Sequence, residues 1–358
     1  MFLIIAVLAV LFIDYWVETA HIFGIFSSGW GITFLVLFFA NFTAYEIVKI
    51  IKKTNIKISL IAILIGVNAM ILGAVVVSQY MCEKIQPIQL TNSNFLNSVY
   101  ADGKSSQTII KTDEINSKLV DFEDVQSMTS EEFYNHMNNA KKQTIHDAIS
   151  IPIPKYFLLI LGFGLIFTYF CWITAFWRNI TTDDQHNQRI LSIVMSMLVF
   201  MLVGFSYACA IFIRIIPFYG LSLIIFTLTV ARLGDSGAYF IGRTFGKNKL
   251  ITQISPKKTI EGSIGGFATS AIIGALLAYL FDLDMIFQSN SIISGAIFGL
   301  IIGFAAQISD LFSSLLKRWA KVKDSSSLIP EFGGILDLSD NFLMALPTMY
   351  VIILIIWV

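Results

Sequence analysis

Long uninterrupted blocks of apolar residues are the feature that most constrains the fold of this chain. Each block is about 17–25 residues long, which is the length that an α-helix needs to cross a hydrocarbon core of roughly 30 Å. Only 13% of the 358 residues are charged, whereas soluble domains have about a quarter. The period-2 alternation typical of a membrane β-barrel is absent from the sequence. The sequence therefore predicts an all-α, polytopic integral membrane protein.

We expect about nine transmembrane helices, at residues 2–17, 30–49, 57–79, 156–177, 189–213, 217–233, 262–281, 291–310 and 342–358. The first block has neither a basic leader nor a small-residue cleavage site, so we interpret it as a retained span rather than a signal peptide. The chain then divides into N-terminal membrane spans at 1–79, a polar extracytoplasmic loop at 80–155, and a C-terminal membrane region at 156–358.

Basic residues predict how these spans are oriented. Lys and Arg are concentrated in three connections, at 49–57, 243–258 and 317–323. If nine spans alternate, all three connections lie on one side, which the positive-inside rule makes cytoplasmic. The polar loop 80–155 then lies outside, where we expect one or two short helices. The formal net charge is zero and gives no indication of a nucleic-acid partner, so we expect none.

Two polar, glycine-rich segments interrupt the apolar sequence, at 231–266 and 307–342. They bring Asp235, Asp310, Asp337 and Asp340 to the predicted cytoplasmic ends of spans. A carboxylate at that depth is costly unless it is paired or bound to a cation, although any single one is equally well explained as an interfacial residue or a helix cap. Four together favour a hard divalent cation such as Mg²⁺, and a second, monovalent cation is left open.

The same two segments predict a phosphate site beside these aspartates. Asp310, Ser314 and Lys317 are spaced to share one face of a helix, which would align an anion, a hydroxyl and a cation. The run 255–259 (SPKKT) is expected to form a tight turn into a new helix, whose free N–H groups and lysines would attract phosphate. The pair Gly333-Gly334 would let the backbone approach a ligand closely.

These residues resemble the C-terminal signature of the phosphatidate cytidylyltransferase (CDP-diacylglycerol synthase) family of integral membrane enzymes. The matching positions are Ser314, Lys317-Arg318, Lys323-Asp324, Pro330, Gly333-Gly334, Asp337 and Asp340. Segments 235–247 and 255–262 resemble the upstream motif of that family. The resemblance covers roughly residues 205–358, and Ala44-Tyr45-Glu46 in the second span resembles the family loosely.

Three positions depart from the family signature. Phe332 stands where His is usual, Leu338 where Arg is usual, and Ser309 where Gly is usual. His and Arg at the first two positions therefore cannot act as acid, base or clamp in this chain. The departures leave room for an altered lipid substrate.

The resemblance implies transfer of a cytidylyl group from CTP to phosphatidic acid, giving CDP-diacylglycerol and pyrophosphate, with Mg²⁺ as the cofactor. It also implies an enzyme of the bacterial inner membrane whose active site faces the cytoplasm, with a homodimer as one assembly to consider. Neither motif contains histidine. A phosphate monoester is already largely ionised at neutral pH, with a second pKa of about 6, so we expect catalysis by positioning and charge neutralisation without a general base.

The resemblance also implies roles for individual residues. We expect the metal on Asp310 and Asp337, with Ser314 as a further ligand and Asp340 in support. Nucleotide binding is assigned to Lys257, Lys258, Thr259 and Glu261, and binding of the lipid phosphate or pyrophosphate to Lys317, Arg318 and Lys323. Asp324, Gly333 and Gly334 complete the expected substrate site, and Asp235 serves either the metal or the nucleotide.

Two other functions remain as alternatives. A CTP-dependent lipid kinase would share the membrane setting and the phosphate chemistry, and it would differ only in the group transferred. A transporter would place its charges in the middle of the membrane, on broken helices in two related halves. The charges of this chain gather instead at one predicted surface.

Overall fold

The computed structural model describes residues 30–54, 56, 58–77, 183–326 and 333–357, together with helical positions 139, 142, 143, 145 and 146. Within this part of the chain, seven helices are long and apolar enough to cross a membrane: Gly31–Lys52, Leu60–Val77, Ile190–Arg214, Gly220–Phe245, Ile260–Leu280, Ser291–Trp319 and Ile335–Trp357. The all-α, polytopic membrane class is confirmed. The expected spans 2–17 and 156–177, and nearly all of the loop 80–155, lie outside the described residues, so the number nine stays a prediction.

The described helices and strands follow one another along the chain in this order. Helix α2 (Trp30–Lys52) is followed by the span Leu60–Val77. Helix α7 (Asp183–Val199), the π-helix η2 (Phe200–Phe205) and α8 (Ser206–Arg214) form one continuous rod. After them come α9 (Gly220–Phe245), strands β1 (Lys249–Ile251) and β2 (Ser255–Thr259), and α10 (Ile260–Leu280). The chain continues through α11 (Asp284–Phe287), α12 (Ser291–Trp319), α13 (Ile335–Ser339) and α14 (Phe342–Trp357).

Helices α9 and α12 are longer than their apolar blocks predict. The expected spans end at residues 233 and 310, whereas the helices continue to Phe245 and Trp319. A hydropathy pattern detects only the segment inside the hydrocarbon, and nothing in the polar continuation breaks the helical hydrogen bonding. Asp235 and Asp310 therefore lie within helices, with about two or three further turns after each of them.

The prediction of a tight turn at residues 255–259 is wrong. These residues form β2, which pairs antiparallel with β1, and Lys249 lies opposite Thr259 in the register. The new helix does begin directly afterwards, at Ile260. The polar segment between α9 and α10 is long enough to fold back on itself, and its paired strands satisfy backbone groups that a single turn into the helix would leave exposed.

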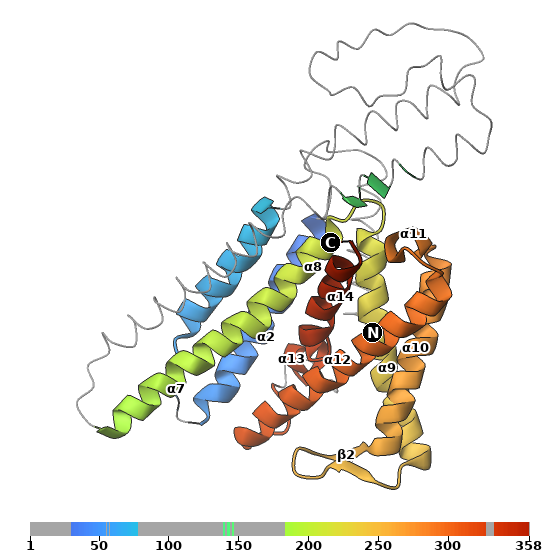
Figure 1. The fold of residues 1–358 in the computed structure, drawn as a ribbon. Helices are drawn as coiled ribbons and strands as arrows, with labels where there is room; N and C mark the ends of the chain where they lie inside the picture. Colours follow the sequence, from blue (N-terminus) through green and yellow to red (C-terminus); the bar gives the residue numbers. More distant parts are fainter. Residues whose placement is uncertain are drawn as a thin grey trace, which may run out of the picture.

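Helices α9, α10 and α12 pack side by side as the right-hand group in Figure 1, with α10 in contact with both others. Their contact surfaces are rich in glycine. A β-carbon at Gly274 would overlap the Gly295 carbonyl of α12, and one at Gly299 would overlap the Ser270 carbonyl of α10. Small residues let helix backbones approach closely, which is how helices gain packing energy in a membrane. This packing fixes Asp235 relative to Asp310.

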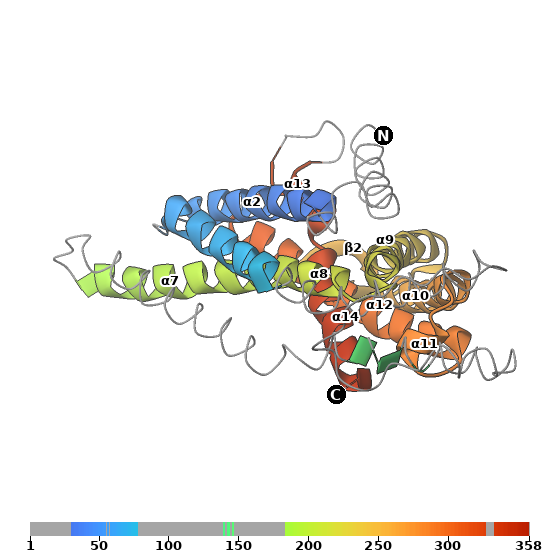
Figure 2. The same ribbon diagram turned by 90° about the horizontal axis from the view of Figure 1, so that it is seen from above.

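Helix α2 contacts α7, η2, α8, α12 and α13, and it lies along one edge of the bundle when the molecule is seen from above in Figure 2. Asn41 of α2 and Asn68 of the following span exchange two amide hydrogen bonds, of 2.9 and 2.7 Å. A core of buried aliphatic and aromatic side chains, including Phe200 and Phe226, joins α2, η2, α8, α9 and α14. Helix α2 thus contacts the C-terminal region of the chain directly.

The C-terminal ends of α2 and α12 and the β1–β2 hairpin lie at the same end of the bundle, whereas α11 and the C-terminal end of α14 lie at the other (Figure 1). This arrangement places the three basic connections at one end of the bundle, as the alternating direction of the spans predicted. A cavity of about 700 Å³ lies between η2, α12 and α14 and is lined by apolar side chains such as Ile308 and Phe312. Asp310 stands midway between those two residues in sequence, so it lies on the opposite face of α12.

Candidate active site

Three carboxyl groups meet where α9, α12 and the junction between α13 and α14 come together. Asp235 lies on α9, Asp310 on α12, and Asp340 at the C-terminal end of α13. The Asp340 side chain is hydrogen-bonded to Asp310, and both carboxyl groups interact electrostatically with Asp235. Asp340 is only 5% exposed. Three of the four aspartates predicted from the sequence are therefore close neighbours in a site mostly shielded from bulk water.

Two lysines reach into this region from different directions. The Nζ of Lys258, on β2, forms an ion pair with Asp310 Oδ2. The Nζ of Lys317, on α12, lies 2.7 Å from Asp337 Oδ1. The two lysine side chains are 23% and 11% exposed. These cations are held in place by carboxylates, and they form the positive side of the site.

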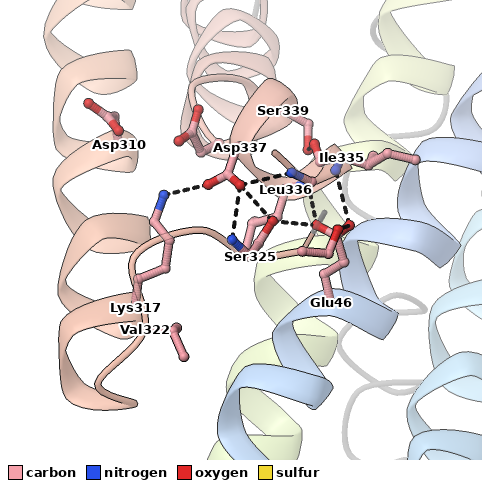
Figure 3. A network of polar contacts seen from close by, with 12 residues as sticks. Glu46, Asp310, Lys317, Val322, Ser325, Ile335, Leu336, Asp337 and Ser339 are labelled. Carbon is pink, nitrogen blue, oxygen red and sulfur yellow. Dashed lines mark hydrogen bonds and ion pairs between the residues drawn. The ribbon is translucent and has the colours of Figure 1, made fainter. Parts of the chain in front are cut away.

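The fourth aspartate, Asp337, is held by its own network at the start of α13 (Figure 3). Its carboxylate accepts hydrogen bonds from the Ser325 backbone N–H (3.0 Å), the Ser325 hydroxyl (2.8 Å) and the Gly334 backbone N–H (3.0 Å), in addition to Lys317. Gly333 has a φ of +85°, which only glycine adopts without strain. A β-carbon at Gly333 would also press against Asp337. Gly333 thus allows a close approach to Asp337, and the predicted approach of the two glycines to a ligand stays a prediction.

The charges of the site leave an excess of negative charge. Four carboxylates face Lys258, Lys317 and also Arg232, which interacts with Asp235 and was not singled out in the sequence. Because bare carboxylates repel each other, the neighbouring Asp310 and Asp340 carboxyl groups favour the binding of a cation. Their oxygen donors are of the type that Mg²⁺ prefers.

Among the residues that the structure describes, no group of three or more His, Cys, Asp or Glu side chains is arranged to hold a metal ion. The carboxyl chemistry of the Asp310–Asp340 pair nevertheless fits a hard cation. The expected Mg²⁺ site on Asp310, Asp337 and Ser314 therefore stays a prediction.

Glu46, on α2, is an acidic residue for which sequence analysis predicted no role in the site. Its side chain is completely buried. It accepts hydrogen bonds from the Ser325 and Ser326 hydroxyls and from the backbone N–H groups of Ile335 and Leu336. The available signal was a lone acid near the polar end of an otherwise apolar span, where burial requires partners.

The β1–β2 hairpin presents its two adjacent lysines differently. Lys258 reaches Asp310, whereas Lys257 is exposed. The Thr259 hydroxyl accepts the Gly262 backbone N–H at 3.1 Å and caps α10, and Glu261 accepts the backbone N–H groups of Lys247 and Asn248. Thr259 and Glu261 thus hold the hairpin on the helix. Their predicted nucleotide-binding roles stay predictions.

The remaining predicted residues lie on the last turns of α12 and in the connection after it. Ser314 is half-buried one turn after Asp310, and Arg318 is exposed and donates to the Ile254 carbonyl at 3.3 Å, which ties α12 to the hairpin. Lys323 and Asp324 are exposed in the connection after α12.

The positions that depart from the signature have different surroundings. The Ser309 hydroxyl donates to the Asp340 backbone carbonyl and so ties α12 to the end of α13. Leu338 is half-buried, and Phe332 lies outside the described residues. A serine at position 309 therefore adds a contact to the acidic cluster that glycine could not make.

The sequence was compared with known protein families. Residues 119–356 match the model of the cytidylyltransferase family, which is more than half of the chain. The chain belongs to this family. The match includes the acidic cluster and the hairpin, whereas Glu46 lies before its first residue.

Curated relatives within the family carry the name phosphatidate cytidylyltransferase. The Bacillus subtilis protein is 36% identical over 148 residues, which are 41% of this chain and 53% of the relative. The Haemophilus influenzae protein is 41% identical over 137 residues (37% and 45%), and the Synechocystis protein is 40% identical over 131 residues (37% and 43%). The aligned regions span about half the length of these relatives.

Proposed function

We propose that this membrane protein transfers a cytidylyl group from CTP to phosphatidic acid, giving CDP-diacylglycerol and pyrophosphate. The observation that carries the proposal is the meeting of Asp235, Asp310 and Asp340 beside the half-buried Lys258 and the buried Lys317, in a member of the cytidylyltransferase family. The names of the relatives support the choice of lipid. A cluster of acids with cations beside it suits a reaction between two phosphate-bearing anions, a nucleoside triphosphate and a phosphate monoester.

In the proposed reaction, an oxygen of the lipid phosphate attacks the α-phosphorus of CTP. A new P–O bond forms, the bond between the α-phosphorus and the oxygen bridging to the β-phosphate breaks, and pyrophosphate leaves with that electron pair. The attacking phosphate is already ionised near neutral pH, because its second pKa is about 6. The residues of the site then need only bind, orient and neutralise charge, as Lys258 and Lys317 are placed to do.

We assign the Mg²⁺ site to Asp310 together with Asp340, with Asp337 and Ser314 as the further ligands expected from the sequence. Bound there, Mg²⁺ would neutralise phosphate oxygens as charge develops on them. The shared hydrogen bond of Asp310 and Asp340 supports the added role of Asp340. Asp235, with the Asn341 amide beside it, is assigned to substrate or metal positioning. A second cation is left open.

We further propose that the hairpin end of the bundle faces the cytoplasm at a bacterial inner membrane. The support is that three basic connections share this end and that bacterial proteins are among the relatives. A homodimer is the assembly that we would test first, by measuring the mass of the detergent-solubilised protein.

The direct test uses purified protein with Mg²⁺, phosphatidic acid and CTP labelled either in cytidine or in the γ-phosphate. Cytidylyl transfer predicts that the cytidine label enters the lipid phase and that the γ-label leaves as pyrophosphate. Entry of the γ-label into lipid would instead establish the lipid kinase. Entry of neither label, with a wild-type protein that is folded, would contradict the proposal.

A further inference from the structure

We infer that Glu46 of α2 is a positioning residue for the transfer reaction. Its carboxylate holds residues 325–326 against the first turn of α13 and so sets Asp337 and Asp340 against α12. The kinetic part of this inference rests on the proposed function. Glu46 lies outside the residues that match the family, which begin at 119. The inference therefore gives helix α2 a part in a site that is otherwise built from residues of the C-terminal region.

The contacts of Glu46 divide evenly between its two oxygens (Figure 3). Oε1 accepts the Ser326 hydroxyl at 2.6 Å and the Ile335 backbone N–H at 3.1 Å. Oε2 accepts the Ser325 hydroxyl at 2.7 Å and the Leu336 backbone N–H at 2.8 Å. Each oxygen thus joins residues 325–326 to the first turn of α13, at 335–336.

The chemistry of this position requires a carboxylate. The side chain is completely buried, and a buried charge is tolerated only with several hydrogen-bond donors. The first N–H groups of a helix have no acceptors within the helix, and Glu46 supplies acceptors to two of them in α13. A β-carbon at Gly334 would overlap both Glu46 and Ser325. Glycine at 334 therefore allows the carboxylate to reach the start of α13.

A shared hydroxyl couples Glu46 to the active site. The Ser325 Oγ lies 2.7 Å from Glu46 Oε2 and 2.8 Å from Asp337 Oδ2. A hydroxyl has one proton, so these two carboxylates compete for a single donor. The opposite side of Asp337 is bound to Lys317. A change at Glu46 therefore alters how Asp337 is held against α12.

Glutamine cannot replace Glu46, although it has the same shape. Each carboxylate oxygen accepts one backbone N–H, from Ile335 or from Leu336. In Glu46→Gln, one of the two positions becomes an NH₂ group, which would point a donor at a backbone donor. A buried N–H is then left without an acceptor. Glu46→Asp keeps both oxygens, with a side chain shorter by one methylene group.

The kinetic test compares full-length Glu46→Gln and Glu46→Asp with the wild type. Asn41→Ala is the matched control. Asn41 lies on α2, as Glu46 does, and its replacement removes the hydrogen bonds to Asn68 of the following span without affecting a contact to α13. Misplaced groups lower turnover rather than affinity, so we expect kcat of Glu46→Gln to fall about 100-fold. The KM for CTP should stay within about threefold, Glu46→Asp should recover part of kcat, and Asn41→Ala should keep the wild-type kcat.

A second measurement needs no turnover. Hydrogen–deuterium exchange should show that residues 333–340 lose protection in Glu46→Gln, while α9 and α10 remain as in the wild type. This readout tests the contacts of Glu46 even if the wild type transfers no cytidylyl group. Wild-type kcat in Glu46→Gln, a loss explained by KM alone, an equal loss in Asn41→Ala, or unchanged exchange would each overturn the inference.

If Glu46→Gln does not fold, Ser326→Ala provides the same test in a milder form. It removes one donor to Oε1 and leaves the carboxylate in place. We expect a smaller fall in kcat at constant KM, with faster exchange at Ile335. Wild-type values of both would overturn the inference.

Discussion

Lys317 Nζ lies 2.7 Å from Asp337 Oδ1, and this ion pair joins the C-terminal end of α12 to the first turn of α13. The two side chains are 11% and 15% exposed. Ser325 and Gly334 bind the same carboxylate from its other side. The placement of α13 against α12 therefore depends on this pair.

Replacing Lys317 by Met should destabilise the protein and stop turnover. Removing one partner of a buried ion pair costs about 3–5 kcal/mol, because the other charge stays buried without compensation. We expect a clear fall in the melting temperature in detergent and a loss of at least about 100-fold in kcat. Lys249→Met, at an exposed position of β1, is the control. Near-normal turnover in Lys317→Met would exclude a role for this lysine in positioning.

Neutralising the acidic residues should abolish Mg²⁺-dependent transfer. Asp310→Asn and Asp337→Asn remove charge without changing shape, and we expect no measurable cytidylyl transfer by protein that still folds. Asp340→Asn should raise the Mg²⁺ concentration needed for half-maximal rate, since it weakens the pair with Asp310. Chelation by EDTA should stop the wild-type reaction, and added Mg²⁺ should restore it. Turnover that persists without a divalent cation would rule out the metal assignment.

The two neighbouring lysines of β2 should differ in their effects. Lys258 is paired with Asp310, whereas Lys257 is exposed. We expect Lys257→Ala to raise the KM for CTP more than that for lipid, at nearly constant kcat. Lys258→Ala should mainly lower kcat, because it leaves Asp310 without its cation. Steady-state kinetics with each substrate varied separates the two patterns. A larger effect of Lys257→Ala on the lipid KM would move this lysine to the lipid site.

Thr259 offers a test of structural against substrate-binding roles. Its hydroxyl caps α10 through Gly262, so Thr259→Ala should cost about 1 kcal/mol of stability. Thr259→Ser keeps the capping oxygen and should restore the melting temperature. If Thr259 acts only as a cap, the KM for CTP should be unchanged in Thr259→Ala. An increase in that KM at full stability would instead support the nucleotide role predicted from the sequence.

Sequence patterns predicted the membrane class and seven spans within the described residues, because burial in lipid leaves long apolar blocks. They placed the ends of α9 and α12 too early, since helices continue beyond the hydrocarbon without a hydropathy signal. The strand at 255–259 was missed for a related reason. Its partner, β1, lies only a few residues away, but neither strand has the apolar alternation of a half-buried sheet.

For the candidate site, the sequence identified the aspartates because acids in apolar surroundings are rare. It could not show that Asp340 faces Asp310 while Asp337 faces Lys317, since that depends on how α13 packs against α12. The role of Glu46 was beyond reach for the same reason. Its partners Ile335 and Leu336 lie 289 and 290 residues further along the chain. No local sequence pattern encodes such a pairing.

This separation has a consequence for biosynthesis. A ribosome adds about 5–20 residues per second, so roughly 15–60 seconds pass between the synthesis of α2 and that of α13. During this interval Glu46 lacks the two backbone N–H groups that bind it in the folded protein. Its hydrogen bonds to Ile335 and Leu336 form only after α13 has been synthesised. Closure of the site is thus a late step in the maturation of the protein, and it is timed by translation.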